Sequence, residues 1–407
     1  MILTQCPVCA AALPHTNAKQ CSRCKTRYCG PACQEQHWKA GHDKLCRKIR
    51  KSGGAEQYHA SKKYTEAVAV AAEACAEDTN GQTCYICTEA VHRHTKEGLV
   101  RGCACHTTEG FVHVSCLAEQ AKILVAEGEE NNLGSEVLNA RWDRWHTCSL
   151  CKQGYHGVVK CALGWACWKA YVGRPEEDQP RSLAMSVLGL GLSNVHHHAD
   201  ALPVYEAQLA MIQRLGADEE DLLATQSNLA STYKELGRPE KAMQMRREVY
   251  FVTLKLLGDR RIHRMRDRDT LGDVVRPEEE APVIIAALNY AQSLQSLNRS
   301  DEAKSLLGTT LPAARRVLGQ SHEITLKTRL LYAVVLYKAD GATLADLREA
   351  VATFEETQRT ALRVFGGAHP LLMEVEAALQ DSQTALHACE ANISRQRDTL
   401  CESERRG

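Results

Sequence analysis

The sequence predicts a multidomain protein in which two small cysteine-rich modules precede an all-α domain of repeated helical hairpins. Two clusters of closely spaced cysteines, one near the N-terminus and one beginning at Cys84, indicate the modules. Beyond Leu183 such pairs stop, and an apolar residue followed by glycine recurs at steps of about 42, 61 and 47 residues, which is typical of stacked helical hairpins. A chain of 407 residues is long enough for several domains.

The composition narrows the classes of function. Lysine plus arginine and aspartate plus glutamate number 50 each, so no excess charge indicates nucleic acid or a membrane surface as a partner. No apolar run approaches the ~20 residues of a membrane span, and the N-terminus lacks the apolar core of a signal peptide. Nineteen cysteines in close pairs, with histidines between them, predict zinc ligands in a reducing compartment. We therefore expect an intracellular protein, cytoplasmic or nuclear.

The central cluster, residues 84–151, contains four pairs of potential metal ligands. A thiolate pair at a two-residue spacing holds one tetrahedral ion from a tight turn, so two distant pairs complete each coordination sphere. The order of the pairs resembles the RING-CH variant of the RING finger. The pairs are Cys84-Tyr-Ile-Cys87, Cys103-Ala-Cys105, His113-Val-Ser-Cys116 and Cys148-Ser-Leu-Cys151.

The RING-CH resemblance implies a zinc module over residues 81–175 with two cross-braced zinc sites. His106 adjoins Cys105 and could replace it, whereas the apolar–His–x–x–Cys–Leu pattern around His113 favours that histidine. The segment after Cys116 is longer than in the family, and the tryptophan usual three residues after Leu117 is missing. The implied sets are Cys84, Cys87, His113 and Cys116 for one zinc, and Cys103, Cys105, Cys148 and Cys151 for the other.

The N-terminal cluster, residues 1–50, also pairs its ligands. The segment Cys33-Gln-Glu-Gln-His37-Trp38, with Tyr28 before Cys29, resembles a MYND finger nearly position for position. His37 competes with His42 as a ligand, and we expect His37 on the surface. The resemblance implies two interleaved zincs, one held by Cys6, Cys9, Cys29 and Cys33, and the other by Cys21, Cys24, His42 and Cys46.

Zinc would be the main source of stability for such a module. A segment of ~40 residues buries too little apolar surface to fold alone, and each zinc contributes roughly 10–16 kcal/mol of apparent binding energy. We expect about four zinc ions in the chain, all structural, because four protein ligands leave no open position for a reaction. In resembling MYND fingers, the positions of Gln34 and Trp38 contact proline-rich peptides; alternatively, Trp38 only covers a small core.

Two connecting segments are also predicted. Residues 51–80 are alanine-rich and favour a linker helix that leans on a zinc module, in which Cys75 packs rather than binds metal. Beyond the central cluster, Cys161 and Cys167 have apolar neighbours and are expected to be buried thiols. The polar, proline-bounded residues 176–182 then form a linker that ends this part of the chain.

The region 183–388 is predicted to form the helical repeats. A helix over 223–236 would end at Gly237 in a left-handed cap, and Pro239 would begin the next helix. The recurring unit resembles tetratricopeptide repeats of the kinesin-light-chain type, and we count four. The predicted fold is thus two small cross-braced zinc modules followed by an all-α tetratricopeptide-like helical repeat domain, with a polar tail over 389–407. The glycine markers are Leu215-Gly216, Leu257-Gly258, Leu318-Gly319 and Phe365-Gly366.

Two polar segments within the repeats are expected to be solvated. The residues from 258 to 282 carry several arginines among acids and predict a mixed-charge surface loop rather than a nucleic-acid arm. His196-His197-His198 falls in a turn between helices, where a solvated loop is expected rather than a metal site.

No catalytic motif accompanies the zinc modules: the sequence has no phosphate-binding loop, nucleophile elbow or metalloprotease helix. The RING-CH resemblance implies an adaptor similar to a ubiquitin ligase, which binds a ubiquitin-conjugating enzyme and raises the effective concentration of substrate. In RING fingers the residue at the position of Ile86 touches the conjugating enzyme, and a basic residue at the position of Lys152 holds ubiquitin. The alternative is a non-enzymatic protein–protein interaction scaffold with structural zinc only.

Overall fold

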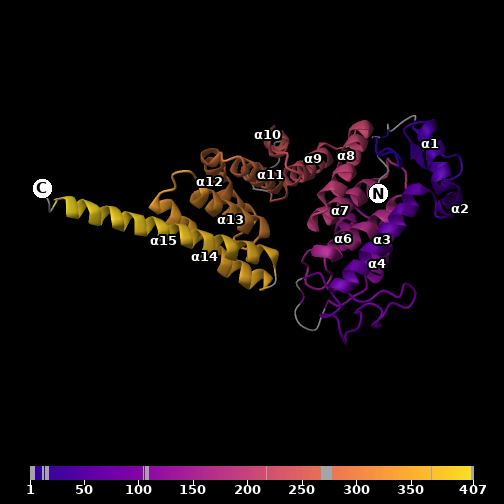
Figure 1. Ribbon diagram of the computed structural model, residues 1–407, viewed down its shortest axis with the longest axis horizontal. Helices are drawn as coiled ribbons and strands as arrows, with labels where there is room; N and C mark the ends of the chain where they lie inside the picture. Colours follow the sequence, from indigo (N-terminus) through magenta and orange to yellow (C-terminus); the bar gives the residue numbers. More distant parts are fainter. Residues whose placement is uncertain are drawn as a thin grey trace. The chain divides into compact units, whose positions relative to one another are not determined.

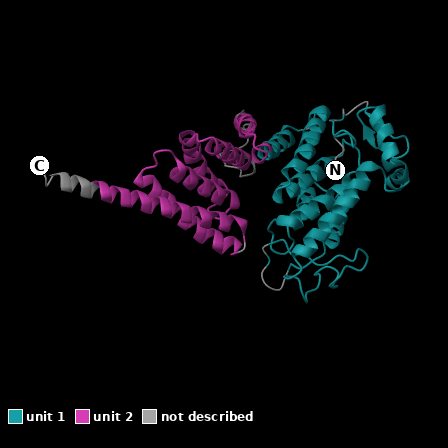
Figure 2. Cartoon of the chain, viewed as in Figure 1, with its two compact units in different colours: residues 1–232 teal, residues 233–407 magenta. Residues whose placement is uncertain are grey.

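A computed structural model of the chain is predominantly helical (Figure 1). The structure describes residues 5–11, 13, 18–103, 105, 110–216, 218–266, 277–367 and 369–404. The chain divides into two compact units, residues 1–232 and 233–407 (Figure 2). Within the described residues, no helix combines the length and the apolar character needed to cross a bilayer.

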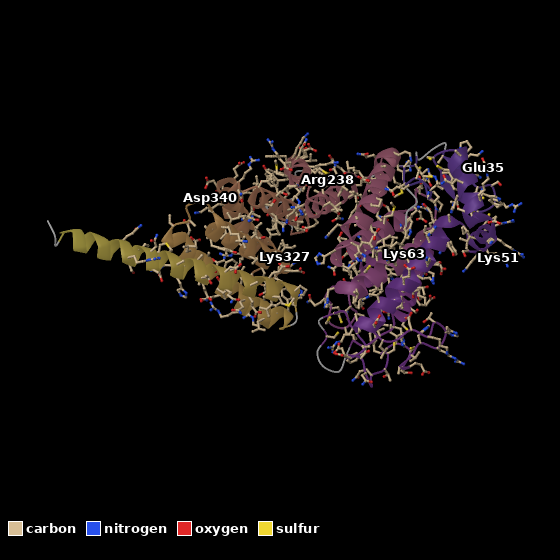
Figure 3. All side chains as sticks on the ribbon, in the orientation of Figure 1. Glu35, Lys51, Lys63, Arg238, Lys327 and Asp340 are labelled. Carbon is tan, nitrogen blue, oxygen red and sulfur yellow. The ribbon has the colours of Figure 1, made fainter. Side chains whose placement is uncertain are left out.

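The N-terminal module is built around its cysteines. Its core contains Cys21, Cys24 and Cys46 packed with Tyr28 and Ile49, so the metal-ligand candidates make up much of the buried surface. Charged side chains such as those labelled on α1 and α2 lie on the outside (Figure 3). The elements are an antiparallel pair, β1 (Lys19–Gln20) and β2 (Arg27–Tyr28), followed by α1 (Pro31–His37), η1 (Trp38–His42) and α2 (Asp43–Lys51).

Helix α3 (Ala55–Ala74) connects the N-terminal module to the central one by packing against both. Its first residue, Ala55, belongs to the N-terminal core. Gln57 Nε2 donates to the Lys169 carbonyl oxygen at 2.9 Å, and the Tyr64 hydroxyl lies 3.0 Å from Ser115 Oγ. Cys75, which follows the helix, is buried outside every metal-ligand cluster of the described residues. The segment predicted as a linker therefore contributes a helix packed at both ends.

The central module is irregular around its cysteines and helical elsewhere. Two isolated antiparallel bridges, Val100 with Val112 and Thr147 with Gly154, hold the loops together. The buried core of this module includes the aromatic side chains of Trp145 and Trp168. The buried Cys161 and Cys167 lie on the helix that carries Trp168. The helices are α4 (Val114–Glu130), α5 (Ser135–Trp142), η2 (Asp143–Trp145) and α6 (Gly157–Tyr171).

Helices α6 and α7 (Gln179–Asn194) approach each other so closely that glycine is required at the contact. A Cβ on Gly191 would lie 2.9 Å from the Lys160 carbonyl oxygen and 3.1 Å from Cys161 Cα. A Cβ on Gly164 would lie 3.0 Å from the Val187 carbonyl oxygen. The predicted linker, residues 176–182, therefore joins two tightly packed helices. Helices α7, α8 (His198–Leu215) and most of α9 (Glu219–Glu235) belong to the first compact unit.

We expect Gly191→Ala to lower the free energy of unfolding of the first unit by about 1–3 kcal/mol, as overpacking typically does, because the crowding atoms are backbone and cannot rotate away. Gly173→Ala is the matched control, since nothing lies within 4 Å of a Cβ at that position. Urea unfolding of both variants measures the difference. Equal midpoints for Gly191→Ala and Gly173→Ala would contradict the close approach.

The second unit is a ladder of antiparallel helices. Each helix from α10 to α15 packs against the next, and α13 also contacts both α11 and α15. Small residues such as the fully buried Ala291 and Ala303 allow this spacing. The helices are α10 (Pro239–Arg266), α11 (Pro277–Ser296), α12 (Ser300–Val317), α13 (Glu323–Lys338), α14 (Leu344–Phe365) and α15 (Pro370–Glu404). This arrangement confirms the predicted fold class, in which cysteine-rich modules are followed in the chain by a tetratricopeptide-like helical repeat domain.

The glycine markers end helices at three of their four positions. Gly216, Gly319 and Gly366 have positive φ and follow α8, α12 and α14, and Gly237 likewise follows α9. The marker Leu257-Gly258 does not end a helix, because α10 continues to Arg266. The predicted surface loop over 258–282 is likewise helical up to 266 and from 277 onward, since arginine, methionine and glutamate are good helix formers; the remainder lies outside the described residues.

Candidate metal centres

The structure brings the sixteen predicted zinc ligands together in the four sets that the two resemblances imply. Within each set, the four sulfur or imidazole nitrogen atoms all lie within 4.8 Å of one another. The segments that contribute to a set are far apart in the sequence, so each cluster ties two stretches of chain together. The sets are Cys6, Cys9, Cys29 and Cys33; Cys21, Cys24, His42 and Cys46; Cys84, Cys87, His113 and Cys116; and Cys103, Cys105, Cys148 and Cys151.

The same turn geometry positions the two thiols of each Cys-x-x-Cys segment. The residue after the second cysteine has a positive φ of 57–64° and donates its N–H to the carbonyl of the first cysteine. The first cysteine in turn donates its N–H to the carbonyl five residues on. This turn directs both thiols to the same side, which is what a chelating pair requires. The residues with positive φ are Ala10, Lys25, Thr88 and Lys152.

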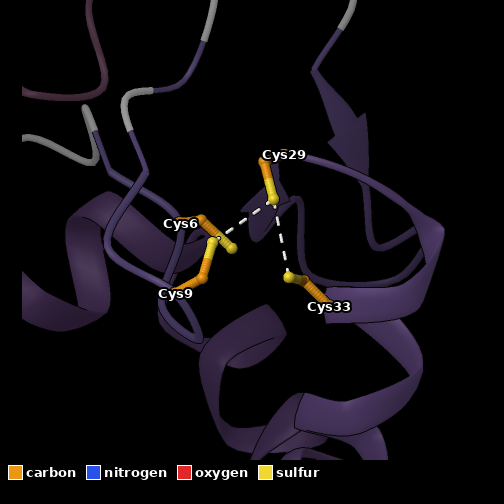
Figure 4. Close-up of side chains that lie close together, drawn as sticks. All are labelled: Cys6, Cys9, Cys29 and Cys33. Carbon is orange, nitrogen blue, oxygen red and sulfur yellow. Dashed lines mark hydrogen bonds between the residues drawn. The ribbon is translucent and has the colours of Figure 1, made fainter.

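The cluster of Cys6, Cys9, Cys29 and Cys33, which we call the outer site, is the most exposed of the four. Cys9 and Cys29 are exposed and Cys33 is half-buried, whereas Cys6 is buried. Cys29 Sγ lies 3.5 Å from the sulfurs of both Cys9 and Cys33 (Figure 4). Cys29 follows β2 and Cys33 lies in α1, so this site attaches the first turn of α1 to the N-terminal turn.

The cluster of Cys21, Cys24, His42 and Cys46, which we call the inner site, is completely buried. Cys24 Sγ lies 3.3 Å from Nε2 of His42, and Cys21 Sγ lies 3.7 Å from Cys46 Sγ. His37, the competing histidine, instead accepts or donates a hydrogen bond with the Tyr28 hydroxyl at 3.1 Å. The structure therefore places His42 rather than His37 among the thiols.

The first central cluster joins the turn at Cys84 to the start of α4. Nδ1 of His113 lies 3.3 Å from Cys87 Sγ and 3.7 Å from Cys116 Sγ. Cys84 Sγ accepts the backbone N–H groups of Ile86 and Cys87 at 3.4 and 3.5 Å. Because such N–H donors stabilise a thiolate, they help to hold this pair in its ligand form.

A glycine, Gly110, packs against the second central cluster. Cys105 Sγ lies 3.7 Å from Cys148 Sγ. Gly110 has φ +86°, and a Cβ there would lie 2.8 Å from Cys105 Cβ and 3.3 Å from Cys103 Sγ. His106, the alternative to Cys105, lies outside the described residues, whereas Cys105 is in the cluster. The backbone at Gly110 thus packs directly on the sulfur cage.

The four clusters fit zinc in both geometry and chemistry. Four ligands at the Zn–S distance of ~2.3 Å in a tetrahedron have sulfurs about 3.8 Å apart. The sulfur pairs named above are 3.5–3.7 Å apart. Thiolate and imidazole side chains, four to a site, are the usual donors for a structural zinc.

The pKa values of the thiols indicate why a cation would be favoured. The hydrogen bond with Cys103 lowers the pKa of Cys148 to about 4, and the same contact raises the pKa of Cys103. Likewise, hydrogen bonding to Cys29 raises the pKa of Cys33 to about 12. Without metal, only part of each set carries charge, because adjacent thiolates repel one another. A divalent cation removes this repulsion and displaces the remaining protons.

The other predicted contact residues are on the surface. Trp38 is 40% exposed; the guanidinium carbon of Arg23 lies 6.0 Å from its ring centre, and the buried His42 ring lies 5.9 Å from it on centroids. Gln34 is half-buried on α1. Ile86 lies at the tip of its turn, and Lys152 is exposed with a positive φ.

Sequence reasoning missed a buried carboxylate beside the first central cluster. Glu97 accepts the Ser115 backbone N–H at 2.7 Å and the Ser115 hydroxyl at 2.8 Å, and so caps the start of α4 between His113 and Cys116. Glu97 comes from a fifth turn of the same geometry, in which Lys96 has φ +60° and His92 donates to the Glu97 carbonyl at 3.0 Å. No cysteine marks this turn, so only its His-x-x-Thr spacing could have revealed it.

Comparisons with known proteins agree with this arrangement at two places. Residues 6–46 match the MYND finger family, and residues 222–263 match a tetratricopeptide repeat family. The N-terminal module is therefore a MYND finger, and a tetratricopeptide repeat lies in the helical region. The RING-CH resemblance of residues 84–151 rests on the ligand order and geometry alone.

Individual proteins resemble parts of the chain. A 47-residue segment is 47% identical to ubiquitin carboxyl-terminal hydrolase 19 of Arabidopsis thaliana; it makes up 11% of this chain and 6% of that protein. A putative kinesin light chain of Podosopora anserina is similar in structure over 62% of this chain and 97% of its own, with 16% identity and a TM-score of 0.36. BtubC (BKLC) of P. vanneervenii is similar over 70% and 92%, with 16% identity and a TM-score of 0.35.

We expect Gly110→Ala to remove one zinc equivalent, since the added methyl group collides with the sulfur cage and the backbone leaves its positive φ. Elemental analysis of the purified, reduced chain gives the metal content per chain. Gly134→Ala is the control, because no atom lies within 4 Å of a Cβ there. Identical metal content in both variants would show that no ion occupies the second central cluster.

Proposed function

We propose that the chain is a zinc-stabilised adaptor that recruits a ubiquitin-conjugating enzyme through its central module and other proteins through its MYND finger and helical repeats. MYND fingers and tetratricopeptide repeats are protein-interaction modules, which supports the adaptor in its broader sense. The observation that carries the finer proposal is a pair of exposed apolar side chains, Ile86 and Leu150, at the tips of two cysteine turns.

These two tips are held side by side. The Tyr85 hydroxyl lies 3.3 Å from Ser149 Oγ, and each of these residues immediately precedes one of the apolar tips. Ile86 is 36% exposed and Leu150 is 43% exposed. A side chain that projects from a metal-anchored turn loses little freedom on binding, so it suits a preorganised contact.

A cavity of about 960 Å³ lies beside Ile86. Helix α4 contributes Gln120 and Ile123 to its lining, and Gln120 stands where the resembling fingers have tryptophan. The exposed Ile123 and Ile86 give the cavity apolar walls, and a partner's apolar side chain would be desolvated there.

The chain itself would perform no covalent step. The zinc ions, held by the four sets described above, would supply rigidity to the turns and no Lewis-acid chemistry. Ile86 and Leu150 would bind the conjugating enzyme, and Lys152 would contact the ubiquitin it carries. The rate of transfer would rise because enzyme and substrate are held in one complex, at high effective concentration.

We expect Ile86→Ala and Leu150→Ala each to reduce ubiquitin-chain formation strongly while leaving zinc content unchanged. Loss of an apolar anchor from a small interface typically costs about 1–2 kcal/mol or more, which is roughly a tenfold loss of binding. The assay uses the full zinc-loaded chain with a panel of conjugating enzymes. Val137→Ala is the control, because Val137 is 46% exposed on α5 of the same module but does not line the cavity. Equal ubiquitin-chain formation by Ile86→Ala and Val137→Ala would contradict the proposed recruitment surface.

A second candidate function, an interaction scaffold without ligase activity, is favoured by the exposed Trp38 on the MYND finger. A tryptophan and a neighbouring arginine can pack against the flat face of a proline-rich peptide. This function needs no conjugating enzyme, and Gln34 would supply a hydrogen bond to the peptide backbone.

For the scaffold we expect the full chain to bind a proline-rich peptide and Trp38→Ala to weaken that binding about tenfold or more, since aromatic anchors dominate such interfaces. Fluorescence anisotropy of labelled peptides measures the affinity. Leu45→Ala, on the exposed face of α2, is a control for loss of apolar surface. Ubiquitin-chain formation together with unaltered peptide binding in Trp38→Ala would argue against the scaffold function.

A further inference from the structure

The outer and inner sites of the MYND finger differ sharply in access to solvent. Both consist of four zinc-type ligands in one small module. Every ligand of the inner site is buried, whereas Cys9 and Cys29 of the outer site are exposed and Cys33 is half-buried. The two central clusters each have at least two buried ligands and no exposed one. An oxidant in solution therefore reaches the sulfurs of the outer site first.

The sulfurs of the outer site are also placed for bond formation. Cys29 Sγ lies 3.5 Å from Cys9 Sγ and 3.5 Å from Cys33 Sγ (Figure 4). A disulfide bond is ~2.05 Å long, so a movement of about 1.5 Å joins Cys29 to either neighbour. Cys29 precedes Gly30 and Pro31 and lies between β2, whose pairing with β1 ends at Tyr28, and α1.

We propose that the outer site is a peroxide-reactive modification site, at which Cys29 is oxidised and the zinc of this site alone is released. The Cys29 thiolate attacks one oxygen of hydrogen peroxide, the O–O bond breaks, and hydroxide leaves with formation of a sulfenic acid. The thiolate of Cys9 or Cys33 then attacks Cys29 Sγ, the S–S bond forms, and a second hydroxide leaves. Two thiolates lose two electrons, peroxide gains them, and two protons from solvent convert both hydroxides to water.

Zinc leaves because a disulfide sulfur is a poor ligand and two thiolates cannot hold the ion. The inner site remains intact because its sulfurs and His42 are shielded, so the core around Tyr28 persists. Helix α1 loses its attachment at Cys33. If the proposed peptide contact at Gln34 is correct, oxidation also weakens peptide binding; this consequence rests on the proposed function, whereas the modification itself does not.

The experiment follows zinc release from the full zinc-loaded chain. Elemental analysis first establishes the metal content, and hydrogen peroxide is then added in steps with a chromophoric zinc indicator present. We expect one zinc equivalent to be released well before the others, with a disulfide from Cys29 to Cys9 or Cys33 found by alkylation and mass spectrometry. Release from the inner or central clusters first, simultaneous release of all zinc, or no metal at the outer site would overturn the proposal.

A matched pair of ligand exchanges separates reactivity from zinc binding. Cys29→His keeps a zinc ligand but removes the reactive sulfur, so the early release should be lost while total zinc is retained. Cys46→His makes the same exchange in the inner site and should leave early release unchanged. Equal early release in Cys29→His and the parent chain contradicts the proposal. If Cys29→His fails to bind zinc, the position of the first disulfide in the parent chain decides the question alone.

Discussion

The convergence of four thiol or imidazole side chains on one point, repeated in four clusters, is the constraint on which the first half of the chain depends. Each of the four clusters ties together segments far apart in sequence, and the N-terminal core consists largely of the ligands themselves. Such a core buries too little carbon to stand alone. The spacing of the cysteines and the glycine that packs against Cys105 and Cys103 both follow from the need to hold four soft ligands around one point.

The ligand sets were predictable from sequence because a cysteine turn is a local structure. Its backbone hydrogen bonds lie within six consecutive residues, and the residue after the second cysteine has a positive φ whether it is alanine, threonine or lysine. Which pair joins which is not local, and there the order of pairs in the two resembling families supplied the answer. The choice of His42 over His37 followed in the same way, since Tyr28 engages His37 in a hydrogen bond instead.

Features created by packing between distant segments were not predictable. The proline-bounded stretch 176–182 has the composition of a domain linker, and nothing in it indicates that glycines at 164 and 191 let α6 and α7 contact each other backbone to backbone. The continuation of α10 past Leu257-Gly258 was likewise not predictable, because a glycine alone does not end a helix. Glu97 escaped notice because a single carboxylate has no period and no partner in the sequence.

The fifth turn, at His92, shows that this turn geometry forms without a pair of cysteines. It has the same backbone hydrogen bonds and the same positive φ, but His92 Nδ1 lies 2.7 Å from Thr95 Oγ1 where the others have two thiols. In this turn a hydrogen bond between two side chains takes the place of the cysteine pair. Because this turn delivers Glu97 to the start of α4, it positions His113 and Cys116 without itself binding metal. Turn geometry and metal binding are therefore separable, and the backbone supplies the geometry in all five turns.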